Sequence, residues 1–303
     1  MSEVRGSFRG FRVLGELSGN PVAAMALTAL ILLTGAGLLA PVVAPRGVVA
    51  GNLADAGIPP VWMEGGSWEL VLGTDAEGRD LLGITLHGLR LTLFMGLGAV
   101  LLQGVAGTGA GLLSGYAGGR VDALFMRATG IQLSFSPLMT AVLLCGAFMA
   151  VSGVDRYGDR AVPWLMAVVA LAEWPRYGRA VRLRTLEERR KEYVEAARIT
   201  GLDPGRILGR HILPNVAGSL PLLTAAQAAN AVACEAVLSF LGLGMPASRP
   251  SLGRLVRSGF DRGFEDSWGV VFFPGLLLVL LLLALKALEN AWRGEIRPRG
   301  LEP

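Results

Sequence analysis

The sequence predicts an all-α membrane protein that crosses the bilayer six times. Hydrophobic residues make up 52% of the 303 residues and charged residues only 17%, whereas soluble domains carry about 25% charged residues. Several stretches without charge are long enough for a crossing, which takes about 20 apolar residues. Because lipid offers no hydrogen bonds to the backbone, each crossing is expected to be helical. A long charged segment, residues 175–213, separates two of these stretches.

Five spans are predicted from charge-free stretches that end near charged residues. They are residues 21–45, 91–113, 128–150, 214–237 and 267–288. A sixth span, at residues 161–174, is short, because its charge-free part runs only from Ala161 to Ala172. It is included because the charged segments otherwise fail to alternate between the two sides of the membrane.

The placement of Lys and Arg predicts the orientation. Cytoplasmic loops carry an excess of these residues, and six spans with a cytoplasmic N-terminus put most of the 28 Lys and Arg residues in the cytoplasm. Both termini are therefore expected there. The run from Pro21 to Pro45 is longer than the apolar part of a signal peptide and has no clear cleavage site, so we expect it to be retained as a membrane anchor.

Residues 1–20 form a basic segment ahead of the membrane domain, residues 21–303. Three arginines alternate there with apolar side chains over residues 3–17, which is typical of a short helix lying in the membrane interface. A disordered basic tail is the alternative. Outer loops are expected at residues 46–90 and 241–266. Acidic residues in the first loop lack the spacing of an EF-hand, so no calcium site is expected from Asp75, Glu77 and Asp80.

The charged segment 175–213 predicts two short helices joined by a glycine turn. Gly201 is expected to end the first helix, as glycine commonly does. Ahead of it, Glu195 stands beside Ala196 and Ala197. Small side chains beside a turn allow a second protein to approach closely. The alternative is an ordinary cytoplasmic loop, made basic only by the positive-inside bias.

The second short helix is predicted to begin at Asp203 and Pro204. Aspartate is a favoured N-cap, and proline is favoured at the first helical position. The apolar stripe of this helix, at a spacing of three to four residues, is formed by Ile207, Leu208, Ile212 and Leu213. Pro214 marks the entry into the next span.

These residues resemble the EAA signature of permease subunits of bacterial ABC importers, through Glu195-Ala-Ala, Gly201 and Ile212-Leu-Pro214. Further motifs resemble the dipeptide/oligopeptide/nickel permease family and occur in the same order over about residues 70–300. They are Leu72-Gly-Thr-Asp-Ala-Glu-Gly-Arg-Asp80, Ser114-Gly-Tyr-Ala-Gly-Gly-Arg-Val-Asp122, Glu235-Ala-Val-Leu-Ser-Phe-Leu-Gly-Leu-Gly244 and Phe273-Pro-Gly275. The chain is most similar to the second, C-type permease. It departs from the family pattern at Ser134-Phe-Ser-Pro137 and at Gly130.

The resemblance implies the type I ABC importer permease fold, with six transmembrane helices and a cytoplasmic coupling helix. Closure of ATPase subunits on ATP would move this helix and switch the spans between inward-open and outward-open arrangements. Residues assigned to ATPase coupling on this basis are Glu195, Ala196, Ala197, Gly201, Asp203, Ile207, Leu213 and Pro214. The implied partners are a second homologous permease chain, two ABC ATPase subunits, an extracytoplasmic solute-binding protein and membrane lipid, but no nucleic acid. The implied location is the bacterial inner membrane.

The sequence itself carries no sign of catalysis. ATP hydrolysis needs a phosphate-binding loop of the form GxxxxGK[ST], and neither of the two lysines, Lys191 and Lys286, lies in such a string. We therefore expect no cofactor in this chain, and ATP and Mg²⁺ on the partner ATPases. No metal site is expected from His87 and His211, which lie far apart in the sequence. The two cysteines, Cys145 and Cys234, are each in an apolar stretch, and no disulfide is expected.

Polar residues within spans often line a path or join helices. Gln227 and Asn230, three residues apart, are candidates for pore lining, with helix–helix hydrogen bonding as an equal alternative. Glu235 lies near the outer end of its span, where water is expected to reach it, and anchoring of the following loop is the alternative. For Gln103 and Gln132 we expect helix–helix hydrogen bonding.

The substrate is not specified by these patterns. Peptides are favoured within the family, and nickel or other metal chelates and glutathione are the alternatives. A homodimer is an alternative to pairing with a second permease. An ion-coupled secondary transporter would require buried carboxylates and usually an internal repeat, and an ion channel would require a repeated filter sequence. Neither pattern is visible in the sequence.

Overall fold

The computed structural model describes residues 21–44, 51–152, 154–218, 220–246 and 248–296, and in these residues the chain is helical without a β-strand. The interfacial helix predicted within residues 1–20 lies outside this part. In chain order the elements are α2 (Pro21–Val43), η2 (Leu53–Asp55), α3 (Leu81–Ala117), α4 (Gly119–Leu133), α5 (Pro137–Ser152), α6 (Val154–Arg189), α7 (Glu192–Ile199), α8 (Pro204–Arg206), η3 (Ile207–Ile212), α9 (Leu213–Ala217), α10 (Leu220–Phe240), α11 (Leu252–Asp261) and α12 (Phe264–Ile296).

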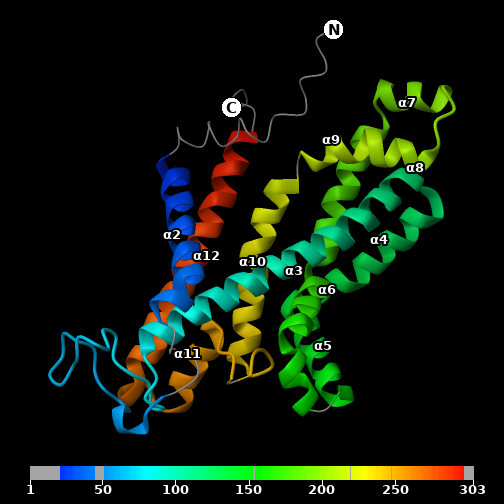
Figure 1. The fold of residues 1–303 in the computed structure, drawn as a ribbon. Helices are drawn as coiled ribbons and strands as arrows, with labels where there is room; N and C mark the ends of the chain where they lie inside the picture. Colours follow the sequence, from blue (N-terminus) through cyan, green and yellow to red (C-terminus); the bar gives the residue numbers. More distant parts are fainter. Residues whose placement is uncertain (1–20, 45–50, 153, 219, 247, 297–303) are drawn as a thin grey trace.

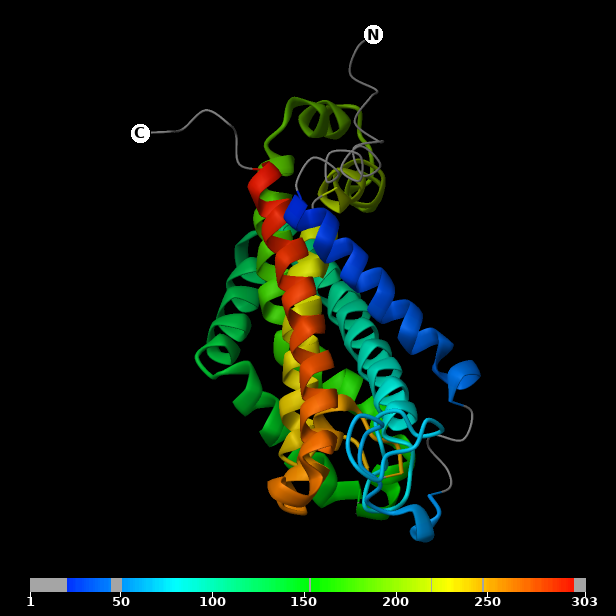
Figure 2. The same ribbon diagram turned by 90° about the vertical axis from the view of Figure 1, so that its left-hand side faces the viewer.

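The long helices form an elongated bundle with two different ends. Helix α2 packs against α3 and α12, and α10 lies between α3, α6 and α12. The short elements α7, α8 and α9 gather at one end, together with the start of α2 and the end of α12 (Figure 1). Helix α11 and the loop before α3 lie at the opposite end, as the rotated view in Figure 2 also shows.

Four helices are long and apolar enough to cross a membrane by themselves. They are Pro21–Val43, Leu81–Ala117, Leu220–Phe240 and Trp268–Arg293 within α12. A fifth crossing results if α4 and α5 count as one broken span. The prediction of several apolar crossings in an all-α chain is thus confirmed, whereas the structure supports four or five spans by composition and not six.

Residues 128–150, predicted as one span, are divided between two helices. Helix α4 ends at Leu133, α5 begins at Pro137, and their axes differ by 87°. Proline cannot donate a backbone hydrogen bond, and it disfavours a helical conformation in the residue before it, here Ser136. The break therefore falls on Ser134-Phe-Ser-Pro137, where the sequence departs from its family pattern.

Other helix boundaries differ from those predicted from the positions of charged residues, because a local N-cap decides where the helix begins. Helix α3 begins at Leu81 and not at residue 91, because the Asp80 carboxylate accepts hydrogen bonds from the backbone N–H groups of Leu82 and Gly83 (3.2 and 3.0 Å). The outer loop predicted to reach residue 90 therefore ends at Asp80. The second outer loop, predicted as residues 241–266, contains the unpredicted helix α11.

No helix boundary falls at the predicted start of the coupling segment, residue 175. Helix α6 continues through Pro175 to Arg189, so the first 15 residues of segment 175–213 extend the preceding helix. At 36 residues, α6 is about 54 Å long. It packs against α3 where Gly107 and Gly111 face Gly178: a Cβ added at Gly111 would lie 2.5 Å from the Gly178 carbonyl oxygen. Small residues thus permit a close helix crossing.

Candidate coupling site and buried polar groups

Helix α7 carries the resemblance to the EAA signature and ends where the sequence predicts. The N–H of Leu202 donates to the Ala197 carbonyl (3.1 Å), and that of Gly201 donates to the Arg198 carbonyl (3.0 Å). This pair of bonds is a Schellman motif, which requires a left-handed residue after the helix. Gly201 supplies it with φ of 75°.

The second half of the segment begins as predicted and then departs from a regular helix. The Asp203 carboxylate accepts a hydrogen bond from the N–H of Gly205 (2.9 Å), and Pro204 is the first residue of α8. The residues that follow form a π-helical stretch, η3, whose hydrogen bonds span five residues. This wider turn lets Ile207 and Ile212 both be buried, at 1% and 0% exposure.

Helix α7 has two different faces. Val194 and Ala197 are buried at 0% and 6% exposure, whereas Glu195 and Ala196 are exposed. Ile199 is 83% exposed, which is unusual for an isoleucine at the end of a short helix. Ala197 therefore packs against its own chain, and the exposed surface of α7 is formed by Glu195, Ala196 and Ile199.

A shallow cavity of about 430 Å³ adjoins this exposed surface. Its walls combine the end of α6 with α7, and its lining residues are Arg189, Arg190, Glu195, Arg198 and Ile199. Three guanidinium groups thus surround one carboxylate and one exposed apolar side chain. Such a mixture can bind a protein groove through both charge and apolar contact.

The buried face of α7 belongs to an apolar cluster that joins several helices. It contains Leu112 of α3, Tyr177 and Val181 of α6, and Val216 of α9, together with the buried residues of α7 and η3. Leu208 and Leu213 pack at its edge. Because such packing is dense and deforms little, a displacement of α7 must move the ends of α3, α6 and α9.

Polar contacts that the sequence did not reveal fix α7 to α6. The Glu188 carboxylate accepts hydrogen bonds from the Tyr193 hydroxyl (2.7 Å) and the Lys191 ammonium (2.6 Å). The Asn215 amide donates to the Tyr193 hydroxyl (3.3 Å), which links α9 to the same group. Burial, and next the Glu188 carboxylate, raise the pKa of Tyr193.

A second set of polar contacts joins the ends of α3, α4 and α6. Arg182 forms a bidentate pair with Asp122, whose Oδ2 lies 2.6 Å from Nη2 of the arginine. The Ser114 hydroxyl donates to the other carboxylate oxygen (2.6 Å). The guanidinium of Arg198 lies 5.3 Å from the ring centre of Tyr116, so α7 also contacts the end of α3. Only the motif Ser114–Asp122 pointed to this region.

Gln227 and Asn230 do not lie in the same environment. Gln227 is 6% exposed, and its amide donates to the Glu173 backbone carbonyl on α6 (3.4 Å). Asn230 is half-buried, donates to the Gln227 carbonyl oxygen (2.9 Å) and accepts from the Lys286 ammonium of α12 (3.4 Å). Both residues therefore join helices, and Asn230 is the more accessible of the two.

The expectation that water reaches Glu235 is wrong, because the residue is 1% exposed. Its Oε1 accepts a hydrogen bond from the Ser239 hydroxyl (2.7 Å), which itself accepts from the N–H of Met245 (3.2 Å). The alternative, anchoring of the following loop, fits this geometry. Of the two glutamines expected to join helices, Gln132 bonds to α6. Gln103 is fully buried with neither amide atom hydrogen-bonded to any residue that the structure describes.

Comparison of the sequence with known proteins identifies the family of this chain. Residues 107–293 match the family of binding-protein-dependent transport system inner membrane components. This chain belongs to that family. The match covers α4 to α10 completely, and with them the coupling segment, α11 and nearly all of α12.

Individual relatives of the permease support the same assignment. The di/tripeptide transport system permease protein DppC of Pseudomonas aeruginosa is 32% identical, over 80% of this chain and 76% of the relative. The dipeptide transport system permease protein DppC of Haemophilus influenzae is 29% identical, over 92% and 91%. The oligopeptide permease protein OppC of the same organism is 34% identical, over 75% and 70%. The prediction of an ABC importer permease is confirmed.

The permease is thus a non-catalytic, multi-pass subunit of the inner membrane. Over the described ranges, His, Cys, Asp and Glu side chains do not gather in groups of three or more that could hold a metal ion. Both cysteines, Cys145 and Cys234, are buried free thiols.

Proposed function

We propose that this permease forms half of the translocation pathway of an ATP-driven importer and that α7 docks on an ABC ATPase subunit. The observation that carries the proposal is the division of α7 into two faces. One face, with Glu195, Ala196 and Ile199, is open. The other packs into an apolar cluster that reaches α3, α6 and α9. A helix built in this way can receive a movement on one side and transmit it on the other.

Each residue of the segment then has a distinct role. Glu195 makes polar contact with the ATPase, and Ala196 allows its surface to come close. Ala197 fixes α7 to the permease core. Gly201 and Asp203 form the turn between the two halves through their capping geometry. The remaining coupling residues transmit the movement to α10: Ile207 and Leu213 through apolar packing, and Pro214 by starting the α9 turn.

We further propose six spans, with both termini in the cytoplasm and α6 as the crossing that composition misses. Leu165, Val169 and Ala172 are nearly fully buried against α3, α5 and α10. A helix surrounded by protein needs fewer apolar residues than one surrounded by lipid, which explains its moderate hydropathy. The described ends of α2 and α12 lie at the same end as α7 (Figure 1), in keeping with a cytoplasmic location of both.

The complete transporter would contain a second homologous permease, two ATPase subunits that bind ATP and Mg²⁺, and an extracytoplasmic binding protein. Since the relatives are named for dipeptide, di/tripeptide and oligopeptide transport, we propose peptides as the substrate class. Asn230, with Lys286 beside it, is the pore-lining candidate, whereas Gln227 and Glu235 hold helices and a loop in place. Mass spectrometry of the ligand held by the cognate binding protein would test the substrate class.

The coupling role is tested by Glu195→Arg, which reverses the charge on the open face of α7. Like charges facing each other in an interface cost several kcal/mol, so we expect peptide uptake into proteoliposomes to fall by about tenfold or more. Either ATP hydrolysis continues without uptake, or the ATPase subunits dissociate from the permease. The matched control is Glu187→Arg, because Glu187 is an exposed carboxylate at the same end of the molecule.

Normal uptake by the Glu195→Arg variant, with normal retention of ATPase subunits, would show that α7 is not the docking helix. Equal losses in both variants would assign the effect to general charge and not to the open face of α7.

A further inference from the structure

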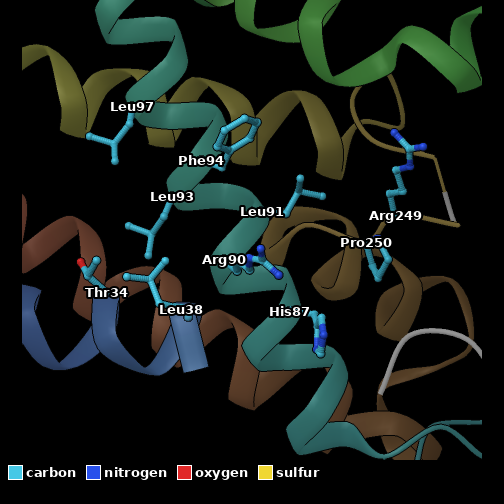
Figure 3. Close-up of a pocket in the computed structure, with 11 residues that line it drawn as sticks. Thr34, Leu38, His87, Arg90, Leu91, Leu93, Phe94, Leu97, Arg249 and Pro250 are labelled. Atoms are coloured by element: carbon cyan, nitrogen blue, oxygen red, sulfur yellow. The ribbon is translucent and has the colours of Figure 1, made fainter. Parts of the chain in front are cut away.

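A second cavity lies at the end of the bundle opposite to α7. It measures about 510 Å³ and opens between α2, α3 and residues 249–250 (Figure 3). Helices α2 and α3 cross closely at its floor, where a Cβ added at Gly37 would lie 3.3 Å from the Cα of Arg90. The two helices diverge on either side of this crossing, which leaves a groove along the outside of α3.

Three basic side chains line the cavity and no acidic one does: His87, Arg90 and Arg249. Arg90 and Arg249 are exposed, and within the described part of the chain neither guanidinium forms an ion pair. Other arginines at this end, Arg79 and Arg262, pair with acidic residues of the loop before α3. Nδ1 of His87 donates to the Gly83 carbonyl (2.9 Å), so Nε2 of the neutral ring is a hydrogen-bond acceptor and the two arginines carry the positive charge of the cavity.

The rest of the cavity wall is apolar and points outward. Leu38, Phe94 and Leu97 are 66%, 61% and 54% exposed. Leu38 lies on α2 beside Arg90, and Phe94 and Leu97 follow Arg90 along α3 toward the middle of the bundle (Figure 3). The apolar surface continues on α3 through Leu101, which is 68% exposed. A cationic head thus lies at the end of the charge-free stretch of α3, and an apolar wall extends from it into the span.

We infer that this cavity binds one anionic phospholipid of the outer leaflet. Its headgroup phosphate lies between Arg90 and Arg249, and an acyl chain lies along Phe94 and Leu97. Arginine matches the geometry of phosphate oxygens through paired N–H donors, and basic pockets between spanning helices bind anionic headgroups. Along the axis of α3 the positive charges come first and the apolar wall follows, which matches the headgroup and acyl chain of a lipid. A free anion would occupy only the charged part and leave the exposed apolar wall uncovered.

Native mass spectrometry of the delipidated full chain in mild detergent tests this inference. Palmitoyl-oleoyl phosphatidylglycerol is compared with the phosphatidylcholine of the same acyl chains, and we expect the anionic lipid to form the more abundant adduct on the unaltered chain. This first arm needs no variant. In the double variant Arg90→Gln/Arg249→Gln the apparent affinity for phosphatidylglycerol should fall by about tenfold. The control Arg254→Gln removes one arginine near the cavity that does not line it, and should retain the adduct.

Two further arms distinguish the sources of the anion. Phe94→Ser should weaken phosphatidylglycerol binding, and millimolar inorganic phosphate should fail to displace the lipid. Equal adducts of both lipids, or an unchanged adduct in the double variant, would overturn the inference. Full displacement by phosphate with no effect of Phe94→Ser would assign the site to a free anion. If the double variant keeps its lipid adduct but no longer co-purifies with the second permease from cells that express both, the surface belongs to a protein partner.

Discussion

Two short amphipathic helices, α7 and α11, lie at opposite ends of the bundle and are held in different ways. Helix α11 is held by contacts to backbone. A Cβ added at Gly253 would lie 2.3 Å from the Ala236 carbonyl oxygen of α10, and one added at Gly259 would lie 3.1 Å from the Val271 nitrogen of α12. The N–H of Leu252 also donates to the Thr92 hydroxyl of α3 (3.1 Å).

Helix α7 packs on the rest of the bundle mainly through side chains. Its turn residue Gly201 and the following Gly209 have open space around them, and its contacts are the apolar cluster and the hydrogen bonds of Tyr193. Close backbone contacts at glycine leave little room for relative movement, whereas the densely packed side chains around α7 can pass a displacement on to the helices they touch. The comparison teaches that the α11 end is a fixed part of the bundle and that the α7 end can transmit a displacement.

The largest change in stability is expected from a substitution at the α11 end. Gly253→Val places a side chain against the Ala236 carbonyl oxygen, so the free energy of unfolding should fall by about 3 kcal/mol, the upper range for overpacking. Gly209→Ala at the α7 end meets no atom within 4 Å and should leave stability equal or higher by about 0.5 kcal/mol. Thermal unfolding of the purified chain in detergent measures both. Equal stability of the two variants would contradict the contrast between the ends.

A smaller effect tests how α4 and α6 are joined near the α7 end. Asp122→Asn weakens the paired hydrogen bonds to Arg182 and the bond from Ser114. Hydrogen bonds to charged groups contribute about 2 kcal/mol, and we expect a loss of that size in unfolding free energy. The control Glu187→Gln breaks an exposed pair with Arg184, which should cost about 0.3 kcal/mol. Similar losses in both variants would show that the Asp122 pair contributes only as a surface ion pair.

The smallest expected effect concerns the polar attachment of α7 itself. Tyr193→Phe removes the hydrogen bond to Glu188 and should lower the unfolding free energy by about 1 kcal/mol near neutral pH. The control Tyr116→Phe keeps the ring that Arg198 contacts and should change stability less.

The pH dependence of this effect follows from the pKa of Tyr193, which burial and Glu188 raise above its ordinary value of 10. Below pH 10 the phenol is protonated in both states, and its stabilisation is complete. As pH rises above 10 the unfolded chain loses this proton while the folded chain retains it, so the folded state loses stability. The difference in unfolding midpoint between the unaltered chain and Tyr193→Phe should therefore be constant below about pH 10 and shrink as the pH rises above 10. A difference that stays constant above pH 10 would show that Tyr193 is not held protonated.

Local sequence signals predicted local structure well. Gly201 ends α7 and Asp203 caps α8 because each signal acts within a few residues. Charge-free stretches located the apolar spans but not their ends, since Asp80 begins α3 ten residues before the stretch does. Pro137 indicated a helix break at Ser134-Phe-Ser-Pro137, but the long charge-free stretch around it led to the prediction of one span.

Contacts between distant residues were beyond the sequence. Nothing local indicates that Asn215 reaches Tyr193, that Arg182 pairs with Asp122 across 60 positions, or that Glu235 is buried beneath the loop it anchors. The position of Ala197 on the inner face of α7 likewise depends on the helix packing against α6 and η3.

The sequence by itself determined the membrane environment, the all-helical class, the family and the capped turn of the coupling segment, because these depend on composition and on short-range backbone chemistry. The tertiary structure alone decided which face of α7 is open, which polar groups within the bundle meet each other, and where unpaired arginines and exposed apolar side chains combine into a cavity. These properties depend on how helices cross, and a crossing is set by residues far apart in the chain that meet only after folding.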